Sequence, residues 1–566
     1  MIDEIITKES ALSLYNEIHN NKNINLFKSQ FYENQEILYS LINTICPPNY
    51  IYGNNWAAES IKFFTIKKDD SWRPMAVPNI KHALMFMYNS INIADSYLNE
   101  LYSKNERLQG KTRHSESPII GRNGMISSTL YDGITNNDVN TEDEKAVGYI
   151  GYNNTNKFFK DSKLQRFRLE SVYPYVLQID ISKFFENVYT HLLAQINIDV
   201  ICESKNKIFL DKYLKWLDEY NQKINDNHTK GIIQGPISSK ISAELFQIYL
   251  DQLIVRVIKD NKLDVDFTRY VDDYRFYAKK YSDLDLMKNI ITKIFRSYEL
   301  SINESKTKIY KGFELQNQSY LMNYSKLKYL INKNNIHKRL SFNDYLILRD
   351  NIILMLDRKE LPTIKSVLTL LNKNISKDNI SFYDNEIVYS FVTFLIKLSY
   401  VKPILSDRIY KLIQIIIDKV SSDYKKKLLN LLLNEIDYVE KNFSGTDLEI
   451  WHFYLISNAG NSKNVIDAFD KYKHQNHNEL NVLVLTVLLK QGNTESNNFI
   501  EKEILKHILP NCKNWISQSK WWLPIAKLWI VNKRDVDINI RSLFFTKKNN
   551  IFWERLGIIE FLMENV

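Results

Sequence analysis

The chain has 566 residues, a formal net charge of +9 and an isoelectric point near 8.9. This length predicts roughly three to four domains, and the shares of charged residues, 25%, and hydrophobic residues, 44%, are ordinary for a globular protein. The basic balance and the 13% aromatic residues suit a nucleic-acid partner, although a large helical core and an AT-biased genome explain the same composition equally well.

Cysteines and hydropathy exclude several classes of protein. Cys46, Cys202 and Cys512 lie far apart, so neither a zinc site nor a disulfide framework is predicted. The N-terminus is acidic and lacks the apolar core of a signal peptide. No apolar run reaches the roughly 18 residues of a membrane span. We therefore expect a cytoplasmic protein with no membrane partner.

The first third of the chain predicts helices, a hairpin and a long insertion. Residues 1–60 predict helices, the last of which ends at Pro47-Pro48. Residues 63–78 predict two strands joined by a polar turn, which form a basic hairpin. A long helix is expected over 81–103, and the polar, Gly- and Asn-rich stretch 104–160 predicts a loop-rich insertion.

The middle of the chain predicts strands that end in acids. Residues 173–181 predict a buried strand ending at Asp180, followed by helices over 182–195 and 207–220. A glycine-containing loop then leads into a helix over 238–259. The alternation over 267–278 predicts a tight hairpin with Asp272 and Asp273 at its tip. A helix over 284–297 and a strand-like segment over 300–309 follow.

After about residue 316, apolar helical spacing repeats to the end of the chain. This pattern favours stacked helix pairs of the HEAT-like kind over an irregular helical domain. The expected helices cover 345–356, 364–371, 387–398, 404–420, 426–439, 448–455, 482–489 and 552–562.

The acids of the middle segment predict a metal site. Alone, Asp272-Asp273 is typical of a solvated acidic turn. Nucleotidyl transfer, however, uses two metal ions about 4 Å apart, held by carboxylates from at least two elements. Asp180 ends a strand 272 − 180 = 92 positions before Asp272, and antiparallel strands would bring both acids to one sheet edge.

Five segments resemble, in order, the motifs of reverse transcriptases over residues 60–310. In chain order, the segments are 73–78 (the first fingers motif), 179–191 (motif A), 231–241 (motif B), 269–273 (the Tyr-x-Asp-Asp motif C) and 300–307 (motif D). The resemblance implies an α+β fold with a right-hand polymerase palm and fingers, followed by an all-α C-terminal domain. The implied domains are an N-terminal helical segment (1–60), fingers with the insertion (61–165), the palm (166–315) and the helical domain (316–566).

The resemblance also implies roles for the acids and for an aromatic residue. Asp180, Asp272 and Asp273 would be the catalytic acids, and with the backbone carbonyl of Ile181 they would hold two Mg²⁺ ions, with Mn²⁺ as the alternative metal. Phe185, five positions after Asp180, matches the steric gate that crowds a 2′-hydroxyl and so favours dNTPs. The alternative for Phe185 is a core side chain.

Further nucleotide contacts follow from the same resemblance. Gln234 and Gly235 would touch the template strand or the nascent base pair. Arg73, with Lys67 or Lys68, would hold the triphosphate. Lys306 would lie near the leaving pyrophosphate as a proton donor.

Within the family, the chain most resembles the bacterial abortive-infection and defence-associated reverse transcriptases, which include the set called the "unknown group". Residues 188–191, Gly235-Pro236 and Ser238, Ser239 and Glu244 carry this resemblance, together with a helical tail in place of the usual thumb. It implies an anti-phage DNA polymerase that is protein-primed and template-independent, whose single-stranded DNA product stays attached to a tyrosine that the sequence does not identify. It also implies a homo-oligomer.

Two alternatives stay open. In the first, the enzyme copies a bound non-coding RNA. In the second, the chain is a catalytically silent scaffold whose helical tail binds a phage or host partner.

Overall fold

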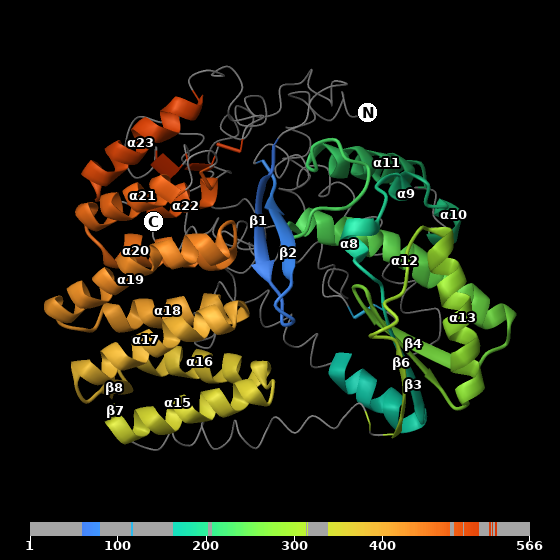
Figure 1. Cartoon of the computed structure of the whole chain (residues 1–566). Coiled ribbons are helices and arrows are strands. Elements are labelled where there is room, and N and C mark those ends of the chain that lie inside the picture. Colours follow the sequence, from blue (N-terminus) through green and yellow to red (C-terminus); the bar gives the residue numbers. More distant parts are fainter. Residues whose placement is uncertain are drawn as a thin grey trace, which may run out of the picture.

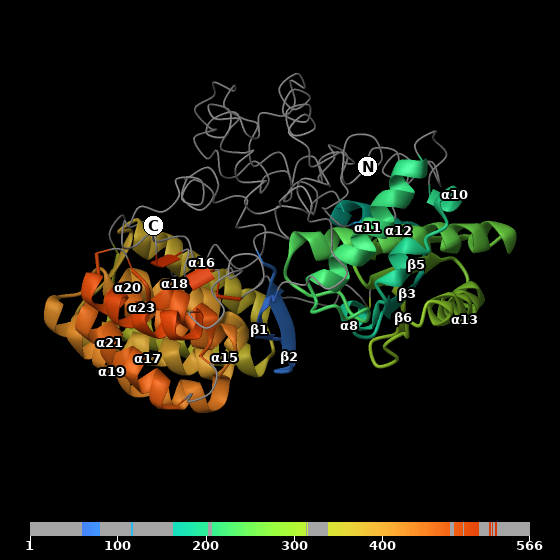
Figure 2. The ribbon, with the colours of Figure 1, turned by 90° about the horizontal axis from the view of Figure 1, so that it is seen from above.

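The computed structural model describes residues 59–79, 115–116, 162–201, 207–312, 314, 338–475, 480–490, 492–508, 520–521, 523–524 and 527–528. They form two bodies with a β-hairpin between them (Figures 1 and 2). The helices predicted over 1–58, 81–103 and 552–562, and nearly all of the insertion 104–160, lie outside the described residues. Among the helices that are described, none combines the length and the apolar character needed to cross a bilayer.

The first body is built on a four-stranded antiparallel sheet in the order β4-β5-β3-β6. Its strands are β3 (Tyr175–Asp180), β4 (Val265–Tyr270), β5 (Asp273–Ala278) and β6 (Lys308–Lys311). The long helices α12 (Ile237–Asp260) and α13 (Tyr281–Ser297) pack on one face of this sheet, where the ring of Tyr274 lies 5.5 Å from that of Phe295 in α13. The strand and hairpin predictions for this region are confirmed.

Alternation along the strands separates a core face from a polar face. Leu177, Ile179 and Tyr274 are fully buried toward the helices. Successive side chains of a strand point to opposite faces. Asp180 and Asp273, each one position away, therefore lie on the face opposite to α12 and α13. Asp273 and the adjacent Asp272 are partly exposed, whereas Asp180 has only 7% of its surface exposed, and the neighbouring apolar side chains anchor the sheet.

Two predictions for this body are wrong in detail. The single helix expected over 182–195 is two short ones, α8 (Phe184–Asn187) and α9 (His191–Ala194). Val188 is extended between them, and Tyr189 forms a β-bridge with Lys230, so a tertiary pairing interrupts the helix. The segment 300–309 is strand-like only at an isolated bridge from Ile302 and in β6. The short α10 (Ile198–Ile201) precedes α11 (Lys207–Lys223).

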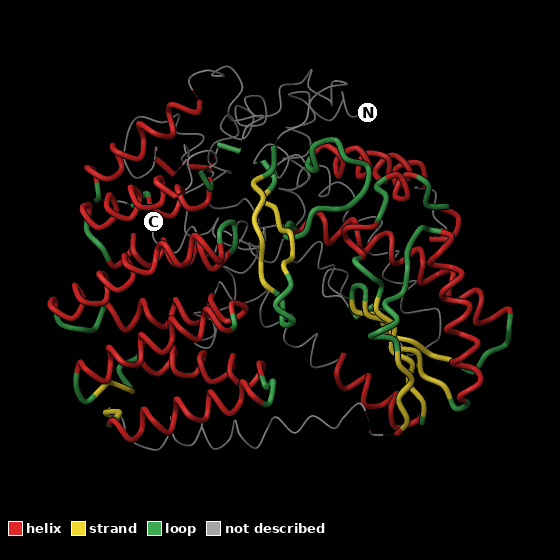
Figure 3. Tube along the Cα trace, viewed as in Figure 1, coloured by secondary structure: helices red, strands yellow, loops and turns green. Residues whose placement is uncertain are grey.

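The hairpin between the bodies consists of β1 (Ile61–Ile66) and β2 (Trp72–Val77), which pair antiparallel as a separate two-stranded sheet (Figure 3). This confirms the predicted basic hairpin. Its backbone bonds to both bodies: the N–H of Ala76 donates to the carbonyl of Gln234, and the N–H of Phe64 donates to the carbonyl of Gly445.

The second body is a stack of helices in two layers. Helices α16, α18, α20 and α22 contact one another in turn, and α15, α17, α19, α21 and α23 form the second layer. Their bounds are α15 (Phe342–Asp357), α16 (Leu361–Ser376), α17 (Asn385–Val401), α18 (Ser406–Ile417), α19 (Ser422–Phe443), α20 (Asp447–Ala459), α21 (Ser462–Gln475), α22 (Val482–Leu488) and α23 (Thr494–Ile508), with a 3₁₀ turn η5 (Pro403–Leu405). The predicted repeat-like helical part is confirmed, although it is not purely helical, because β7 (Lys338–Leu340) pairs with β8 (Ile380–Phe382).

Candidate active site

Three carboxylates meet at one end of the four-stranded sheet. Asp180 is the last residue of β3 and lies directly opposite Asp273, the first residue of β5. Asp272 lies in the turn between β4 and β5, where its carbonyl accepts the backbone N–H of Ile181 at 3.2 Å. The sheet register thus places side by side the acids that the sequence separates.

The turn that carries Asp272 is strained. Only Val271 and Asp272 connect the two strands, and Val271 has a φ of +54°. Two-residue hairpin loops place positive φ at positions that glycine normally takes. A β-branched residue in this conformation costs on the order of 1–3 kcal/mol and persists only where the surroundings enforce it.

Burial and mutual repulsion raise the pKa values of two acids. Burial, the largest cause, raises the pKa of Asp272 to about 6; its own backbone N–H lowers the value, and the charges of Asp273 and Asp180 add to the rise. Burial and then the charge of Asp180 also raise the pKa of Asp273. The site therefore concentrates more negative charge than its surroundings compensate.

Lys306 contacts the site directly. The N–H of Asn303 donates to the carbonyl of Asp180 at 2.7 Å, which holds the loop after α13 against the end of β3. The Lys306 ammonium then lies 3.1 and 3.2 Å from the two carboxylate oxygens of Asp180, with 61% of its side chain exposed. An exposed lysine on this acid can leave it without breaking the core.

Phe185 lies in α8, which begins four residues after Asp180. Its ring packs edge-on against that of Phe184 at 5.5 Å, and its carbonyl accepts the N–H of Ile232 at 2.7 Å. Phe184 is buried, with 1% of its surface exposed, whereas Phe185 is only partly buried. Phe184 belongs to the core, and Phe185 packs against that core while it keeps part of its surface exposed.

The loop with Gln234 and Gly235 packs against β2. Gly235 has a φ of +119°, and a Cβ atom there would lie 3.0 Å from the carbonyl oxygen of Ala76. The close backbone approach at this glycine is therefore to the hairpin. Arg73 shares one face of β2 with Met75, whose Cε would lie 3.4 Å from that same Cβ. Arg73 is exposed on the side of the hairpin that faces this loop.

Lys67 and Lys68 lie in the turn at the tip of the β1–β2 hairpin. The neighbouring Asp70 is held at 2.7 Å by Lys402, which follows α17 of the helical stack. The structure thus brings Asp180, Asp272, Asp273 and Lys306 together, and it places Phe185 in the helix that follows Asp180. Arg73 lies on the side of the hairpin that faces the Gln234 loop, and the hairpin tip is joined to the second body through Asp70 and Lys402.

The donor set fits a cation that a substrate completes. Among the described residues, no group of three or more His, Cys, Asp or Glu side chains could hold a metal ion by itself. The carboxylates at the adjoining ends of the central strands β3 and β5 are nevertheless the oxygen donors that Mg²⁺ prefers. Mg²⁺ in such sites keeps positions for substrate phosphates. Asp180, Asp272 and Asp273 are therefore suited to an open site and not to a closed cage.

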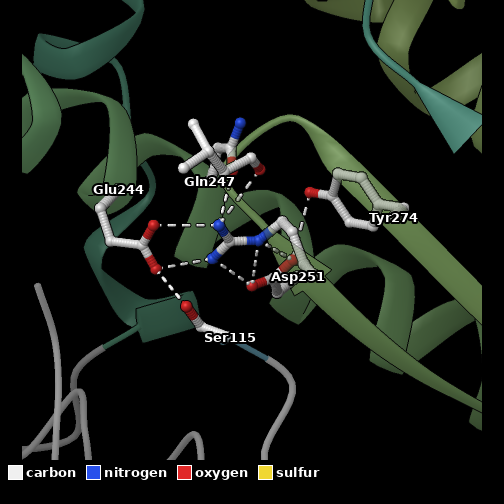
Figure 4. A network of polar contacts seen from close by, with 7 residues as sticks. Ser115, Glu244, Gln247, Asp251 and Tyr274 are labelled. Atoms are coloured by element: carbon white, nitrogen blue, oxygen red, sulfur yellow. Dashed lines mark hydrogen bonds and ion pairs between the residues drawn. The ribbon is translucent and has the colours of Figure 1, made fainter. Parts of the chain in front are cut away.

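A buried network behind the acids was missed by the sequence analysis. Arg269 in β4 bonds to Glu244, Gln247 and Asp251 of α12 (Figure 4). The signal was available: polar residues at positions i, i+3 and i+7 share one face of a helix that is otherwise buried and apolar.

Comparison with known protein families identifies one domain of the chain. The family model described as "Reverse transcriptase (RNA-dependent DNA polymerase)" matches residues 129–333. This part of the chain is a reverse transcriptase domain. It contains Asp180, Phe185, Gln234, Asp272 and Lys306, and for this part of the chain it confirms the predicted reverse transcriptase family and polymerase fold. The defence-associated group within that family stays a prediction, and Arg73 and the β1–β2 hairpin lie before the matched residues.

One curated relative resembles part of the chain. The Retron Ec48 reverse transcriptase of Escherichia coli is 28% identical over 138 residues, which are 24% of this chain and 30% of the relative. The chain therefore spans about a third of the length of the relative that it matches.

Two solved structures that align with part of the chain are telomerases from Candida species. Telomerase from Candida albicans in complex with a fragment of telomeric RNA has 13% identity and a TM-score of 0.28, covering 70% of this chain and 66% of that one. Apo telomerase from Candida tropicalis has 13% identity and a TM-score of 0.29, covering 75% and 74%. Such TM-scores do not establish a shared fold, so the assignment of the reverse transcriptase domain rests on the family match and on the sheet.

Proposed function

We propose that the protein is an anti-phage defence DNA polymerase of reverse-transcriptase type that adds nucleotides from dNTPs. The observation that carries this proposal is the pairing of Asp180 with Asp273, next to Asp272 in the chain, at one end of the sheet in a reverse transcriptase domain. A scaffold without activity has no need of three acids held at the cost of burial and repulsion.

The proposed chemistry is phosphoryl transfer. Asp180, Asp272 and the Ile181 carbonyl would hold two Mg²⁺ ions, with Mn²⁺ as the alternative, and Asp273 would support them. Bound metal supplies charge neutralisation and activation of the attacking hydroxyl. That hydroxyl would lose its proton to solvent water as its oxygen bonds to the α-phosphorus, while the bond from this phosphorus to the bridging oxygen breaks and pyrophosphate leaves. Lys306, now paired with Asp180, would give a proton to the leaving group.

The remaining contacts would position the nucleotide. Arg73 would hold the triphosphate from the hairpin, since its guanidinium suits bidentate phosphate contacts. Gln234 and Gly235 would face the template strand or the nascent pair. Lys67 or Lys68, in the turn of the same hairpin, would assist Arg73 in holding the triphosphate.

Phe185 would select dNTPs by crowding the 2′-hydroxyl of an NTP. Support comes from its position five residues after Asp180 and from its partial exposure, in contrast to the buried Phe184. Phe185→Val should raise incorporation of NTPs relative to dNTPs by about 10- to 100-fold, the range that shape complementarity provides. Phe184→Leu is the matched control and should lower stability without changing this ratio. An unchanged ratio in Phe185→Val would reject the gate.

We further propose protein-primed synthesis without a template, in a homo-oligomer, with single-stranded DNA left on a tyrosine. The support is the resemblance to defence-associated enzymes and the helical stack in the place of a thumb. RNA-templated synthesis on a bound non-coding RNA is the second candidate, and the similarity to a retron reverse transcriptase favours it. In either case the partners are dNTPs and nucleic acid.

One experiment separates these possibilities. The purified protein is incubated with Mg²⁺ and labelled dNTPs without added template, and products are resolved on denaturing gels before and after protease or RNase treatment. A ladder that shifts with protease supports protein priming, and RNase-sensitive synthesis with co-purifying RNA supports the templated route. If no nucleotide is incorporated and Asp272→Ala still protects cells from phage, the scaffold replaces the polymerase.

A further inference from the structure

The buried side of the catalytic hairpin is organised around one arginine. Arg269 in β4 is 0% exposed and pairs across the sheet with Tyr274, on the face opposite to the catalytic acids. Its guanidinium donates to side chains from α12, and Tyr274 and Ser115 complete the network (Figure 4). The contacts are Nε to both oxygens of Asp251 at 3.0 and 2.9 Å, Nη2 to Asp251 at 2.8 Å and to Glu244 at 2.9 Å, and Nη1 to Glu244 at 3.0 Å and to Gln247 at 2.6 Å.

This arrangement fixes the position of the arginine. A buried charge is tolerated only when it is paired and hydrogen-bonded, and here one planar fork meets two carboxylates and an amide oxygen. Glu244 is itself held by the hydroxyl of Ser115 at 2.5 Å, and Asp251 by the hydroxyl of Tyr274 at 3.2 Å. The guanidinium therefore has one geometry relative to α12.

The same arginine reaches the strained turn. Its Nη1 also approaches the carbonyl oxygen of Val271, at 3.4 Å, and its own carbonyl accepts the N–H of Glu116 at 2.6 Å. Val271 is the residue with a φ of +54°, immediately before Asp272. A strained turn needs surroundings that enforce it, and Arg269 links this turn to the long, largely buried helix α12.

We propose that Arg269 is a positioning residue for nucleotidyl transfer: through its fork on Glu244 and Asp251 it anchors the β4–β5 turn, and this anchor sets where Asp272 and Asp273 present their carboxylates to metal. The inference rests on the proposed polymerase function. A lysine has a single ammonium and cannot reproduce the fork, so it separates the position of the turn from the presence of a positive charge.

The test measures metal binding and local opening as well as activity. In Arg269→Lys, the Mg²⁺ concentration for half-saturation, measured by calorimetry without nucleotide, should rise about 10- to 100-fold, as is usual when a residue that orients metal ligands is changed. Hydrogen exchange should accelerate in peptides covering 178–183 and 268–276, because the Ile181 N–H bonds to the carbonyl of Asp272. Exchange in α19 and α20 should not change.

A purely structural role gives a different result. If Arg269→Lys lowers the melting temperature but keeps the wild-type Mg²⁺ half-saturation and the wild-type exchange at the hairpin tip, the positioning role is wrong. If wild-type protein neither binds Mg²⁺ nor incorporates nucleotides, the proposed function fails. Faster exchange at the tip in Arg269→Lys would still support the anchor in that case, and unchanged exchange would overturn it.

A milder pair of variants covers the case in which Arg269→Lys does not fold. Tyr274→Phe removes one hydroxyl from the network, and Tyr277→Phe removes one from the same buried strand, where it faces Thr268 at 3.3 Å. Tyr274→Phe should raise the Mg²⁺ half-saturation about three- to tenfold, the worth of one buried hydrogen bond, and Tyr277→Phe should not change it. Equal effects in the two variants would reject the proposal.

Discussion

Two β-hairpins with strands of six residues each serve this protein in opposite ways. The catalytic hairpin β4–β5 is part of a larger sheet, and its turn is held from within by Arg269, whose partners lie 18 to 25 positions away in the chain. The hairpin β1–β2 is a sheet of its own and is held from outside. Lys62 pairs with Asp226, 164 positions away, and Asp70 with Lys402, 332 positions away.

The β4–β5 hairpin holds its residues in a fixed position, whereas the position of the β1–β2 hairpin depends on its neighbours. Buried charged hydrogen bonds with several partners fix a geometry, whereas an isolated two-stranded hairpin is marginal in water and takes its position from what it touches. Asp272 and Asp273 therefore have one place, while Arg73 stands where the first body and the helical stack together put it. We expect changes at the catalytic hairpin to abolish chemistry, and changes at the β1–β2 hairpin to alter nucleotide affinity.

The largest effect is expected at the catalytic turn. Asp272→Asn should lower nucleotide incorporation by at least about a thousandfold, because metal bound at this site would stabilise the transition state by several kcal/mol. Asp264→Asn, an exposed acid before β4 that pairs with Lys279 at 3.3 Å, is the matched control and should keep wild-type activity. Similar losses in both variants would remove the special role of the turn.

The same substitution should stabilise the metal-free protein at neutral pH. The pKa of Asp272 is raised from 3.8 to about 6, so between these values the folded protein holds a proton that the unfolded chain releases. Stability from this group is present below pH 4 and is lost as the pH rises through 6. Denaturant unfolding in EDTA at pH 7.5 should show Asp272→Asn more stable by roughly 1–3 kcal/mol, with little difference at pH 4. Added Mg²⁺ should stabilise only the wild type.

A smaller effect is expected where the β1–β2 hairpin meets the first body. In Gly235→Ala, the new methyl group would lie 3.0 Å from the carbonyl of Ala76, at a backbone φ of +119°. The strain costs on the order of 1–3 kcal/mol and should displace the hairpin. Steady-state kinetics should show a raised KM for dNTP with a smaller change in kcat. Gly492→Ala, at a φ of +88° with open space around it, is the control for backbone strain alone.

The smallest effect is expected at the tip of this hairpin. Lys402→Gln removes the ion pair with Asp70, whose side chain is 55% exposed, and such pairs contribute less than about 1 kcal/mol. The melting temperature should change little and the KM for dNTP by at most about threefold. A loss of activity comparable to that of Asp272→Asn would show that the helical stack controls the chemistry, and would overturn the contrast between the two hairpins.

The sequence by itself determined the strands, the catalytic hairpin and the helical tail, because alternation and helical spacing are local consequences of which face is buried. It also predicted the acids and Phe185 through motif order. Only the tertiary structure decided that Val188 interrupts a predicted helix, because its cause is a pairing of Tyr189 with Lys230. The same holds for Arg269: its partners lie on a different element, and the strain at Val271 depends on backbone geometry that no local pattern encodes. The position of Arg73 likewise follows from contacts across hundreds of residues.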